Sequence, residues 1–314
     1  MLYIGIDTSC YTTSIACVNQ DGVVADIRMP LVVKPGERGL RQSEGLFQHT
    51  KNLAVITKQL FSTVDARNVG GIAVSGKPCD TENSYMPVFL AGRTVATAIA
   101  SSLSLNLIET THQQGHIRAA LYGVREIKDE FIGMHISGGT TDVFMCDKQL
   151  ELKCVGKSND LHAGQLVDRV GVKLGYSFPA GKHLEQLAMK HSGEHLKIPS
   201  SVKRLDCSLS GAENMLMRYI DAGEDKENIA YAMYDMLART FAKQIVNASC
   251  EFGIKQAVFL GGVASSQLLR CLLLKRVSKL SGDLDIEFGA PELSSDNAVG
   301  VALICRDRCI GEGK

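Results

Sequence analysis

The sequence predicts an α/β protein whose two lobes arose by duplication, with a ligand-binding cleft between them. Residues 3–18 align without gaps with residues 131–146, and each copy reads as a strand, a tight polar turn and a second strand. Apolar residues at helical spacing follow the strands in both halves. Because ligands commonly bind between such lobes, we expect the functional site in the interlobe cleft.

The two copies of the repeat share residues in the first strand and in the turn. The identical pairs are Ile4/Ile132, Gly5/Gly133, Ser9/Ser137, Thr12/Thr140 and Thr13/Thr141. A further hairpin turn is predicted after each copy, at Asp21-Gly22 and at Asp147-Lys148. Both lobes are therefore expected to begin as antiparallel meanders.

Helices and buried strands complete each lobe. In the first half, helices are predicted over residues 46–61 and 89–105, with a buried strand over 70–76 between them. In the second half, the predicted elements are a helix ending at Gly253, a strand and a second helix, over residues 227–253, 256–262 and 265–277.

The boundary between the lobes is predicted between residues 125 and 126, because the second copy of the repeat begins at residue 131. The N-terminal lobe then spans residues 1–125, and the C-terminal lobe spans residues 126–295. The last helix, within residues 296–314, is expected to pack back on the N-terminal lobe.

Composition excludes several classes of protein. A 45% hydrophobic content and 34 basic against 34 acidic residues argue against disorder and against a basic nucleic-acid coat. No apolar run approaches the length of about 20 residues that a bilayer requires. Ten scattered cysteines and a start without an export signal indicate reduced thiols, so we expect a cytoplasmic protein that does not bind membranes.

The polar turns of the repeat are candidate binding elements. In the second turn, Ile136–Thr140, the glycines Gly138 and Gly139 leave backbone N–H groups free to approach a phosphate or nucleotide. The alternative is a tight hairpin without a ligand, but its duplication favours function. The side chains at the strand ends, Asp7, Ser9 and Ser137, are the candidate catalytic groups.

A candidate metal site comes from His112 and His116, which lie on one face if their segment is helical. Such a pair is often only solvated, so a third ligand is needed. Asp296 lies where a loop gives way to an apolar helix, and its alternative role is a helix cap. Two histidines and a carboxylate with open positions suit Fe²⁺ or Zn²⁺.

Four further positions are candidate nucleotide contacts. Gly261 and Gly262 lie between a buried strand and a helix, where backbone and dipole can hold a nucleotide. Asp168 is predicted on a helix, where its carboxylate can accept hydrogen bonds from ribose hydroxyls. Gly181 is predicted in a turn, where its backbone can lie against a sugar or base. A solvated helix and an ordinary turn are the alternatives for this pair.

Together these motifs resemble the tRNA threonylcarbamoyladenosine transferase (TsaD, or glycoprotease) family. The resemblance covers most of the chain, in order: IGIDTSC, HQQGH, SGGTTD, GQLVDRVGVKLG with PAG, SLSG, GGVASSQLLR and SSDNA. It implies the actin-like, sugar-kinase-like and Hsp70-like fold, built from two RNase H-like lobes. It also implies transfer of threonylcarbamoyl from threonylcarbamoyl-AMP to N6 of adenosine 37 in tRNA.

The resemblance assigns roles residue by residue. His112, His116 and Asp296 become ligands of one divalent metal, Fe²⁺ or Zn²⁺. The adenine nucleotide is expected on the turn and five further residues: Ile136, Ser137, Gly138, Gly139, Thr140, Asp168, Gly181, Gly261, Gly262 and Ser266. Implied partners are tRNA, a scaffold homologue and a small ATPase, and the oligomeric state, including a homo-oligomer, is left open.

The chain also departs from the family pattern. Tyr11 and Thr12 replace two acidic residues of the bacterial members, and Thr140 and Ser266 replace a His or Asn and an Asn. These changes indicate a divergent paralogue. Two alternatives are therefore a nucleotide-binding regulatory paralogue without activity and an ATP-dependent kinase of the same fold. A protease is disfavoured, because HQQGH lacks the Glu of HExxH enzymes.

Overall fold

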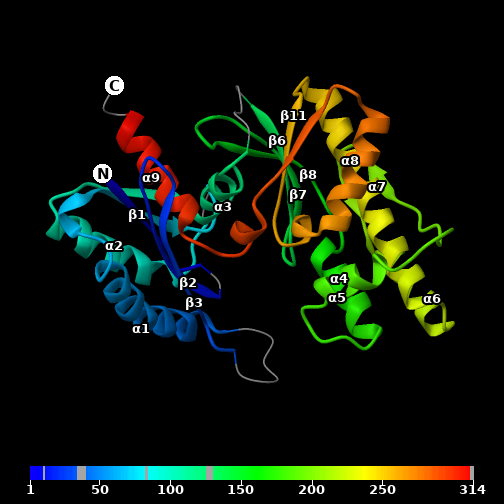
Figure 1. The fold of residues 1–314 in the computed structure, drawn as a ribbon, viewed down its shortest axis with the longest axis horizontal. Helices are drawn as coiled ribbons and strands as arrows, with labels where there is room; N and C mark the ends of the chain where they lie inside the picture. Colours follow the sequence, from blue (N-terminus) through cyan, green and yellow to red (C-terminus); the bar gives the residue numbers. More distant parts are fainter. Residues whose placement is uncertain (10, 34–39, 82–83, 125–129, 312–314) are drawn as a thin grey trace. The chain divides into compact units, whose positions relative to one another are not determined.

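The computed structural model describes residues 1–9, 11–33, 40–81, 84–124 and 130–311. Two compact units divide the chain: unit 1 comprises Met1–Tyr122 and Ser295–Lys314, and unit 2 comprises Gly123–Ser294 (Figure 1). The predicted boundary between residues 125 and 126 lies outside the described residues. Each unit is described by itself, and the interlobe cleft stays a prediction.

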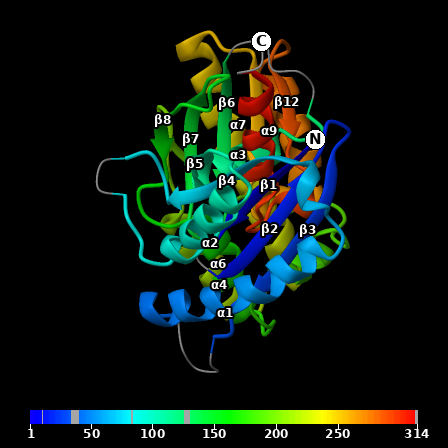
Figure 2. The ribbon, with the colours of Figure 1, turned by 90° about the vertical axis from the view of Figure 1, so that its left-hand side faces the viewer.

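Unit 1 is built on a five-stranded mixed sheet in the order β3-β2-β1-β4-β5 (Figure 2). The meander strands β1, β2 and β3 pair antiparallel, whereas β4 and β5 continue the sheet in parallel. The strand bounds are Leu2–Asp7, Thr12–Val18, Val23–Pro30, Val69–Lys77 and Leu107–Thr111.

Helices cover both faces of this sheet. Ile4 and Ile6 of β1 lie in a core shared with α1 and α2, while Gly5, on the opposite side of the strand, packs against α9. The seven residues from Val299 to Cys305 are all buried, so α9 is a core helix. The helix bounds are Gln42–Phe61 for α1, Phe89–Ser102 for α2, His112–Ala120 for α3 and Val299–Gly311 for α9, with a short 3₁₀ turn η1 at Ala66–Asn68.

Unit 2 repeats this sheet topology, in the order β12-β11-β6-β7-β8. Its strands are Phe131–Ile136 (β6), Thr141–Cys146 (β7), Leu152–Lys157 (β8), Gln256–Leu260 (β11) and Asp285–Phe288 (β12), and a separate two-stranded sheet is formed by Ser201–Lys203 (β9) and Asp206–Ser208 (β10). Its helices are Ala163–Lys173 (α4), Gly181–Ala188 (α5), Ser210–Asp221 (α6), Lys226–Phe252 (α7) and Gln267–Leu280 (α8), with 3₁₀ turns at Val263–Ser265 (η2) and Pro291–Leu293 (η3).

The predicted duplication is confirmed by strand register. Asp7 pairs with Ser14 between β1 and β2, and the equivalent residues His135 and Asp142 pair between β6 and β7. The predicted strands and long helices are also confirmed, with ends shifted by a few residues. Gly181 is an exception, because it begins helix α5 instead of lying in a turn.

Among the described residues, no helix combines the length and the apolar character needed to cross a bilayer. The nine described cysteines all carry free thiols, and Cys10 lies outside the described residues.

Candidate metal centre and nucleotide-binding turn

The predicted histidine pair lies on α3, whose start is fixed by a capping box. Thr111 Oγ1 accepts a hydrogen bond from Gln114 N at 3.1 Å, and Gln114 Oε1 accepts one from Thr111 N at 3.1 Å. This reciprocal pairing satisfies N–H groups that a helix start leaves unbonded. His112 is therefore the first residue of the helix, and His116 follows one turn later on the same face.

Asp296 reaches this face from the loop before α9. Asn297, and not Asp296, accepts the hydrogen bond from Val299 N, at 3.0 Å, so the cap role considered for Asp296 belongs to its neighbour. The side chain of Arg28 on β3 donates to Ser295 Oγ at 2.9 Å and ties this loop to the sheet. Asp296 is thereby left with its carboxylate facing the histidines.

Helix α9, which follows the loop of Asp296, approaches α3 very closely. A Cβ added at Gly300 of α9 would lie 1.8 Å from the carbonyl oxygen of Gly115 of α3. Only glycine permits this contact, because the obstacle is backbone and has little room to move. Gly300 thus permits the close approach of α9 to α3, and with it the short distance between the histidine pair and the loop of Asp296.

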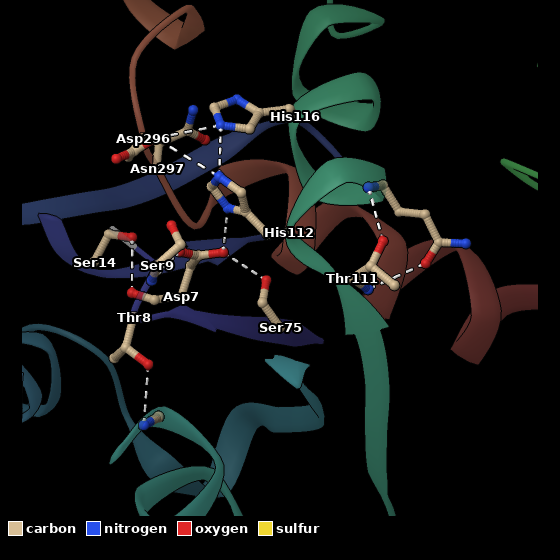
Figure 3. Close-up of polar contacts among 12 residues, drawn as sticks. Asp7, Thr8, Ser9, Ser14, Ser75, Thr111, His112, His116, Asp296 and Asn297 are labelled. Atoms are coloured by element: carbon tan, nitrogen blue, oxygen red, sulfur yellow. Dashed lines mark hydrogen bonds and ion pairs between the residues drawn. The ribbon is translucent and has the colours of Figure 1, made fainter. Parts of the chain in front are cut away.

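The three predicted ligands converge on one point (Figure 3). His112 Nε2 and His116 Nε2 are 3.0 Å apart, and Asp296 Oδ1 lies 3.3 Å from His116 Nε2 and 3.7 Å from His112 Nε2. All three ligand atoms lie within 4.8 Å of one another. Unit 1 alone therefore supplies the complete candidate metal centre.

Asp7 orients this centre from below (Figure 3). Its Oδ2 lies 2.9 Å from His112 Nδ1 and accepts from Ser75 Oγ at 2.6 Å, while its Oδ1 accepts from the amide and hydroxyl of Ser9 at 2.9 and 2.5 Å. Burial raises the pKa of Asp7, but the charge of His112 and these hydrogen bonds outweigh it and hold the pKa below its usual range. Asp7 is consequently a buried carboxylate.

The same contact controls His112. Burial lowers the pKa of His112, but the negative charge of Asp7 and the hydrogen bond to it outweigh burial and raise the pKa above its ordinary value. A proton on Nδ1 shared with Asp7 leaves Nε2 facing the other two ligands, which is the orientation a metal-binding histidine needs. Two imidazole nitrogens and one carboxylate oxygen therefore fit a divalent cation such as Zn²⁺ or Fe²⁺.

In unit 2, the predicted nucleotide-binding turn is open. Ser137 N donates to Thr140 O at 2.8 Å, which closes the turn, and a Cβ at Gly138 or Gly139 would meet nothing within 4 Å. The start of α4 is fastened to it, because Gly164 N donates to Ser137 O at 3.0 Å and Ala163 N donates to Thr141 Oγ1 at 2.9 Å. The N–H groups of this exposed glycine backbone can thus donate hydrogen bonds to an oxyanion.

Three other predicted contacts gather at one place in unit 2. Asp168 Oδ1 accepts from Ala180 N at 2.8 Å, and the adjoining Gly181 carbonyl accepts from Tyr234 Oη at 3.1 Å. Burial and then the charge of Glu185 raise the pKa of Tyr234, and Ser266 hydrogen-bonds this same phenol. Tyr234 therefore links Gly181 and Ser266, and Asp168 holds the neighbouring residue Ala180.

Glu185 and Tyr234 are members of this cluster that the sequence analysis did not identify. Glu185 Oε1 accepts from Ser266 Oγ at 2.8 Å and from Leu268 N at 2.9 Å, so this carboxylate caps the start of α8. Its position one helical turn after Gly181 is the pattern that could have identified it. Tyr234 lies on a long helix of buried residues, where no sequence pattern separates it from the core.

The remaining predicted residues lie near these elements. Gly261 follows β11 with φ of +97° and packs against the carbonyl of Ile136, next to the open turn, while Gly262 is unobstructed. Tyr11 and Thr12 lie in unit 1, where the Tyr11 side chain is exposed. Unit 1 thus brings together the metal ligands with Asp7 and Ser9, and unit 2 brings together the predicted nucleotide contacts.

Comparison with known sequences identifies the family. Residues 45–303 match the family model of the tRNA N6-adenosine threonylcarbamoyltransferases. A protein of that name from Sulfurihydrogenibium sp. is 28% identical over 311 residues, covering 96% of this chain and 89% of that protein. One from Thermococcus sibiricus is 26% identical over 308 residues, covering 96% and 90%.

Comparison with solved structures agrees on the fold. HypF of T. kodakarensis matches with a TM-score of 0.61 and 16% identity, covering 99% of this chain and 48% of that protein. Component A of the Acidaminococcus fermentans (R)-2-hydroxyglutaryl-CoA dehydratase matches with a TM-score of 0.60 and 16% identity, covering 99% of both. The predicted actin-like α/β fold and the family resemblance are both confirmed.

Proposed function

The chain belongs to the tRNA N6-adenosine threonylcarbamoyltransferase family, and from that premise we propose that it transfers a threonylcarbamoyl group from threonylcarbamoyl-AMP to N6 of adenosine 37 in tRNA. The N6 amine forms a bond to the carbamoyl carbon, and the bond from that carbon to the phosphate oxygen breaks. AMP leaves with the electron pair, and N6 gives up one proton.

The observation that supports this proposal is the convergence of His112, His116 and Asp296 within 4.8 Å. A divalent ion bound there supplies Lewis-acid catalysis and neutralises phosphate charge. Asp7 holds the Nδ1 proton of His112, so that Nε2 faces the centre. Ser9 and Ser75 in turn hold Asp7 through hydrogen bonds, which preorganises the ligands.

Unit 2 is proposed to bind the adenylate. The N–H groups of Gly138 and Gly139 donate to its phosphate oxygens, and the Ser137 hydroxyl lies beside them. Asp168, Gly181 and Ser266 form the adenosine contact, with Gly261 and Gly262 completing the phosphate side. Thr140 and Ser266 are shorter than the residues they replace, so this contact is expected to be looser than in the family's other members.

The test is formation of threonylcarbamoyladenosine by the purified chain with threonylcarbamoyl-AMP, tRNA and either Fe²⁺ or Zn²⁺. The wild type is expected to form product, and the Asp296→Asn and His112→Ala variants are expected to lose at least about tenfold in rate. Asp21→Asn, an exposed carboxylate in a hairpin of the same unit, is the matched control. Product formation by all variants alike would refute the metal role.

A second candidate is favoured by Tyr11 and Thr12, which replace two acidic residues of the bacterial relatives. On this view the chain is a regulatory paralogue that binds adenine nucleotide without transferring a group. Nucleotide binding with no product, even after addition of the scaffold homologue and the small ATPase that the family implies, would support it. Product formation by the chain would exclude it.

A further inference from the structure

A polar pocket of about 460 Å³ lies in unit 1, on a side of α3 away from the metal ligands. Thr111 and Gln114 of the capping box form part of its wall. Gln114 is two residues beyond His112, and side chains at that spacing do not share a helix face. The pocket is therefore distinct from the metal centre. Its charged and aromatic lining residues are Lys77, Asp80, Tyr85, Arg93, Glu109 and Arg308.

The described lining residues carry three cations and two carboxylates. Lys77 Nζ pairs with Asp80 at 2.6 Å, and Arg93 pairs with Glu109 at 2.8 Å. In the part of the chain that the structure describes, no carboxylate pairs with Arg308, whose NH1 donates to the backbone carbonyl of Glu109 at 3.2 Å. The described pocket wall thus carries one excess positive charge.

Two further features suit an anionic, base-bearing ligand. The pocket lies against the first turn of α3, where the helix dipole favours negative charge. Tyr85 on the rim is 62% exposed, so its ring can stack on a nucleobase. Arg308 can donate two parallel hydrogen bonds to a phosphate, which lysine cannot do.

We propose that this pocket binds a phosphodiester of the RNA acceptor, with Arg308 on the phosphate and Tyr85 stacked on an adjacent base. The inference rests on the proposed function, because it takes RNA as the substrate. It adds an RNA-docking site in unit 1 that is separate from the candidate metal centre. The two sites lie on different sides of helix α3.

The role of the Arg308 charge is tested by binding of an anticodon stem-loop RNA to the full chain. Fluorescence anisotropy measures the affinity at several salt concentrations. Arg308→Gln is expected to weaken binding about three- to tenfold and to reduce the slope of log affinity against log salt by about 0.7, the value for one single-stranded phosphate contact. Tyr85→Ala is expected to weaken binding at least about fivefold with the slope unchanged, and Tyr85→Phe to bind normally.

Arg67→Gln is the matched control, because Arg67 is an 88% exposed arginine of the same unit, paired with Asp65 at 2.7 Å. Equal effects of Arg308→Gln and Arg67→Gln on affinity and slope would overturn the proposal.

Cys79 can report on ligand binding in the pocket, since its Sγ lies 3.3 Å from Oγ of the lining residue Ser84. Burial raises the pKa of the Cys79 thiol, but hydrogen bonds with Ser84 and Thr81 and the charge of Lys77 outweigh it and lower the pKa. The lowered pKa favours the thiolate form of Cys79, which is the form that alkylating reagents attack. Bound RNA is expected to slow its alkylation by iodoacetamide several-fold while exposed Cys250 on α7 reacts as before.

Inorganic phosphate and AMP test the alternative that the pocket binds a free phosphate ion or a nucleotide instead of RNA. Protection of Cys79 by either one as strong as by RNA at equal concentration would assign the pocket to a free anion and overturn the RNA proposal.

Transfer assays on the same variants separate this inference from the proposed function. Arg308→Gln is expected to raise KM for tRNA with kcat unchanged, whereas His112→Ala lowers kcat and leaves RNA affinity unchanged. Arg308-dependent RNA binding without any transfer would refute the proposed function alone. Transfer with binding that is independent of Arg308 would refute the pocket alone.

Discussion

The turns that follow β1 and β6 have the same strand register and opposite chemistry. In unit 1, Asp7, Thr8 and Ser9 are fully buried, and the Asp7 carboxylate is surrounded by donors. In unit 2, His135 takes the place of Asp7, and Gly138 and Gly139 expose backbone to solvent. One copy therefore presents side chains that hold a metal ligand, and the other presents N–H groups.

The layers beneath the two turns also differ. A Cβ at Gly5 would lie 2.3 Å from Ala302 N, on the backbone of α9, whereas a Cβ at Gly133 would lie 2.0 Å from the ring of Phe144. Unit 1 thus uses the space beside its glycine for a helix, and unit 2 fills the same space with one side chain. The duplicated strands are therefore the same in both units, whereas the layer that covers them differs.

This difference explains why the candidate metal centre occurs in unit 1. The helix that packs on Gly5 begins three residues after Asp296, so its docking brings that carboxylate to the histidines. A buried polar network is stable only when every member is bonded, and Asp7 receives those bonds from Ser9 of the turn after β1 and from Ser75 of β4.

The largest expected effect concerns Gly5 and Gly133, the two glycines at which the units differ. Gly5→Ala should lower the free energy of unfolding by about 3 kcal/mol or more, because the new methyl meets helix backbone. Gly133→Ala should cost less, since the Phe144 ring can move. Urea unfolding followed by circular dichroism measures both.

The double variant Gly133→Ala with Phe144→Ala isolates the role of the ring. Its loss should be smaller than the sum of the two single losses, because removing the ring removes the clash. Equal losses for Gly5→Ala and Gly133→Ala would contradict the proposed difference in the covering layer.

The next effect concerns Asp7, the buried carboxylate that only unit 1 has at this turn. Asp7→Asn should weaken Zn²⁺ or Fe²⁺ binding about 10- to 100-fold, as expected when a carboxylate partner of a metal-bound histidine is lost. Competition with a chromophoric chelator measures the affinity. Asp21→Asn is the control, and an unchanged affinity in Asp7→Asn would show that His112 needs no partner.

Unit 2 has its own buried carboxylate, Asp235, and it predicts a pH dependence. Arg239 and Arg276 donate to it at 2.8 and 2.6 Å, its side chain is 4% exposed, and although burial raises its pKa, these arginines lower it overall. Because the folded-state pKa lies below the unfolded value, its stabilisation is present above about pH 4 and is lost as pH falls through the folded pKa.

Asp235→Asn should therefore cost about 1–2 kcal/mol at pH 7, and its deficit relative to wild type should shrink below about pH 4. Urea midpoints from pH 7 to pH 3 measure this. The fully exposed pair of Asp283 and Lys255 provides the control, since Asp283→Asn should change little at any pH. A deficit that stays constant with pH would refute the charge argument.

The smallest effect compares the two capping glutamines. Gln114→Ala removes the Oε1 atom that accepts from Thr111 N and Thr110 Oγ1 at the start of α3 and should cost about 1 kcal/mol, with a few-fold loss of metal affinity. Gln165→Ala removes a single contact with His162 N at 3.2 Å, at the start of α4, and should cost less without affecting metal. Thermal unfolding and chelator competition distinguish them, and Gln114→Glu should retain most of both properties.

Much of the candidate site was predictable from particular residues. The spacing of His112 and His116 predicted a shared face, and the glycines at 138 and 139 predicted an open turn. The role of Asp7 as a support for His112 was not predictable, because the two residues lie far apart in the sequence and meet only in the folded unit. Glu185 and Tyr234 were missed for the same reason, since their partners come from distant segments.

The sequence by itself determined the duplicated strands, the long helices and the identity of the candidate metal ligands, because periodicity and residue chemistry are local properties. Only the tertiary structure decided that Asp296 meets the histidines and that Asn297 takes the capping role beside it. These outcomes depend on how closely α9 approaches Gly5 and Gly115. Close packing of distant segments is fixed by the whole unit, so no short stretch of sequence encodes it.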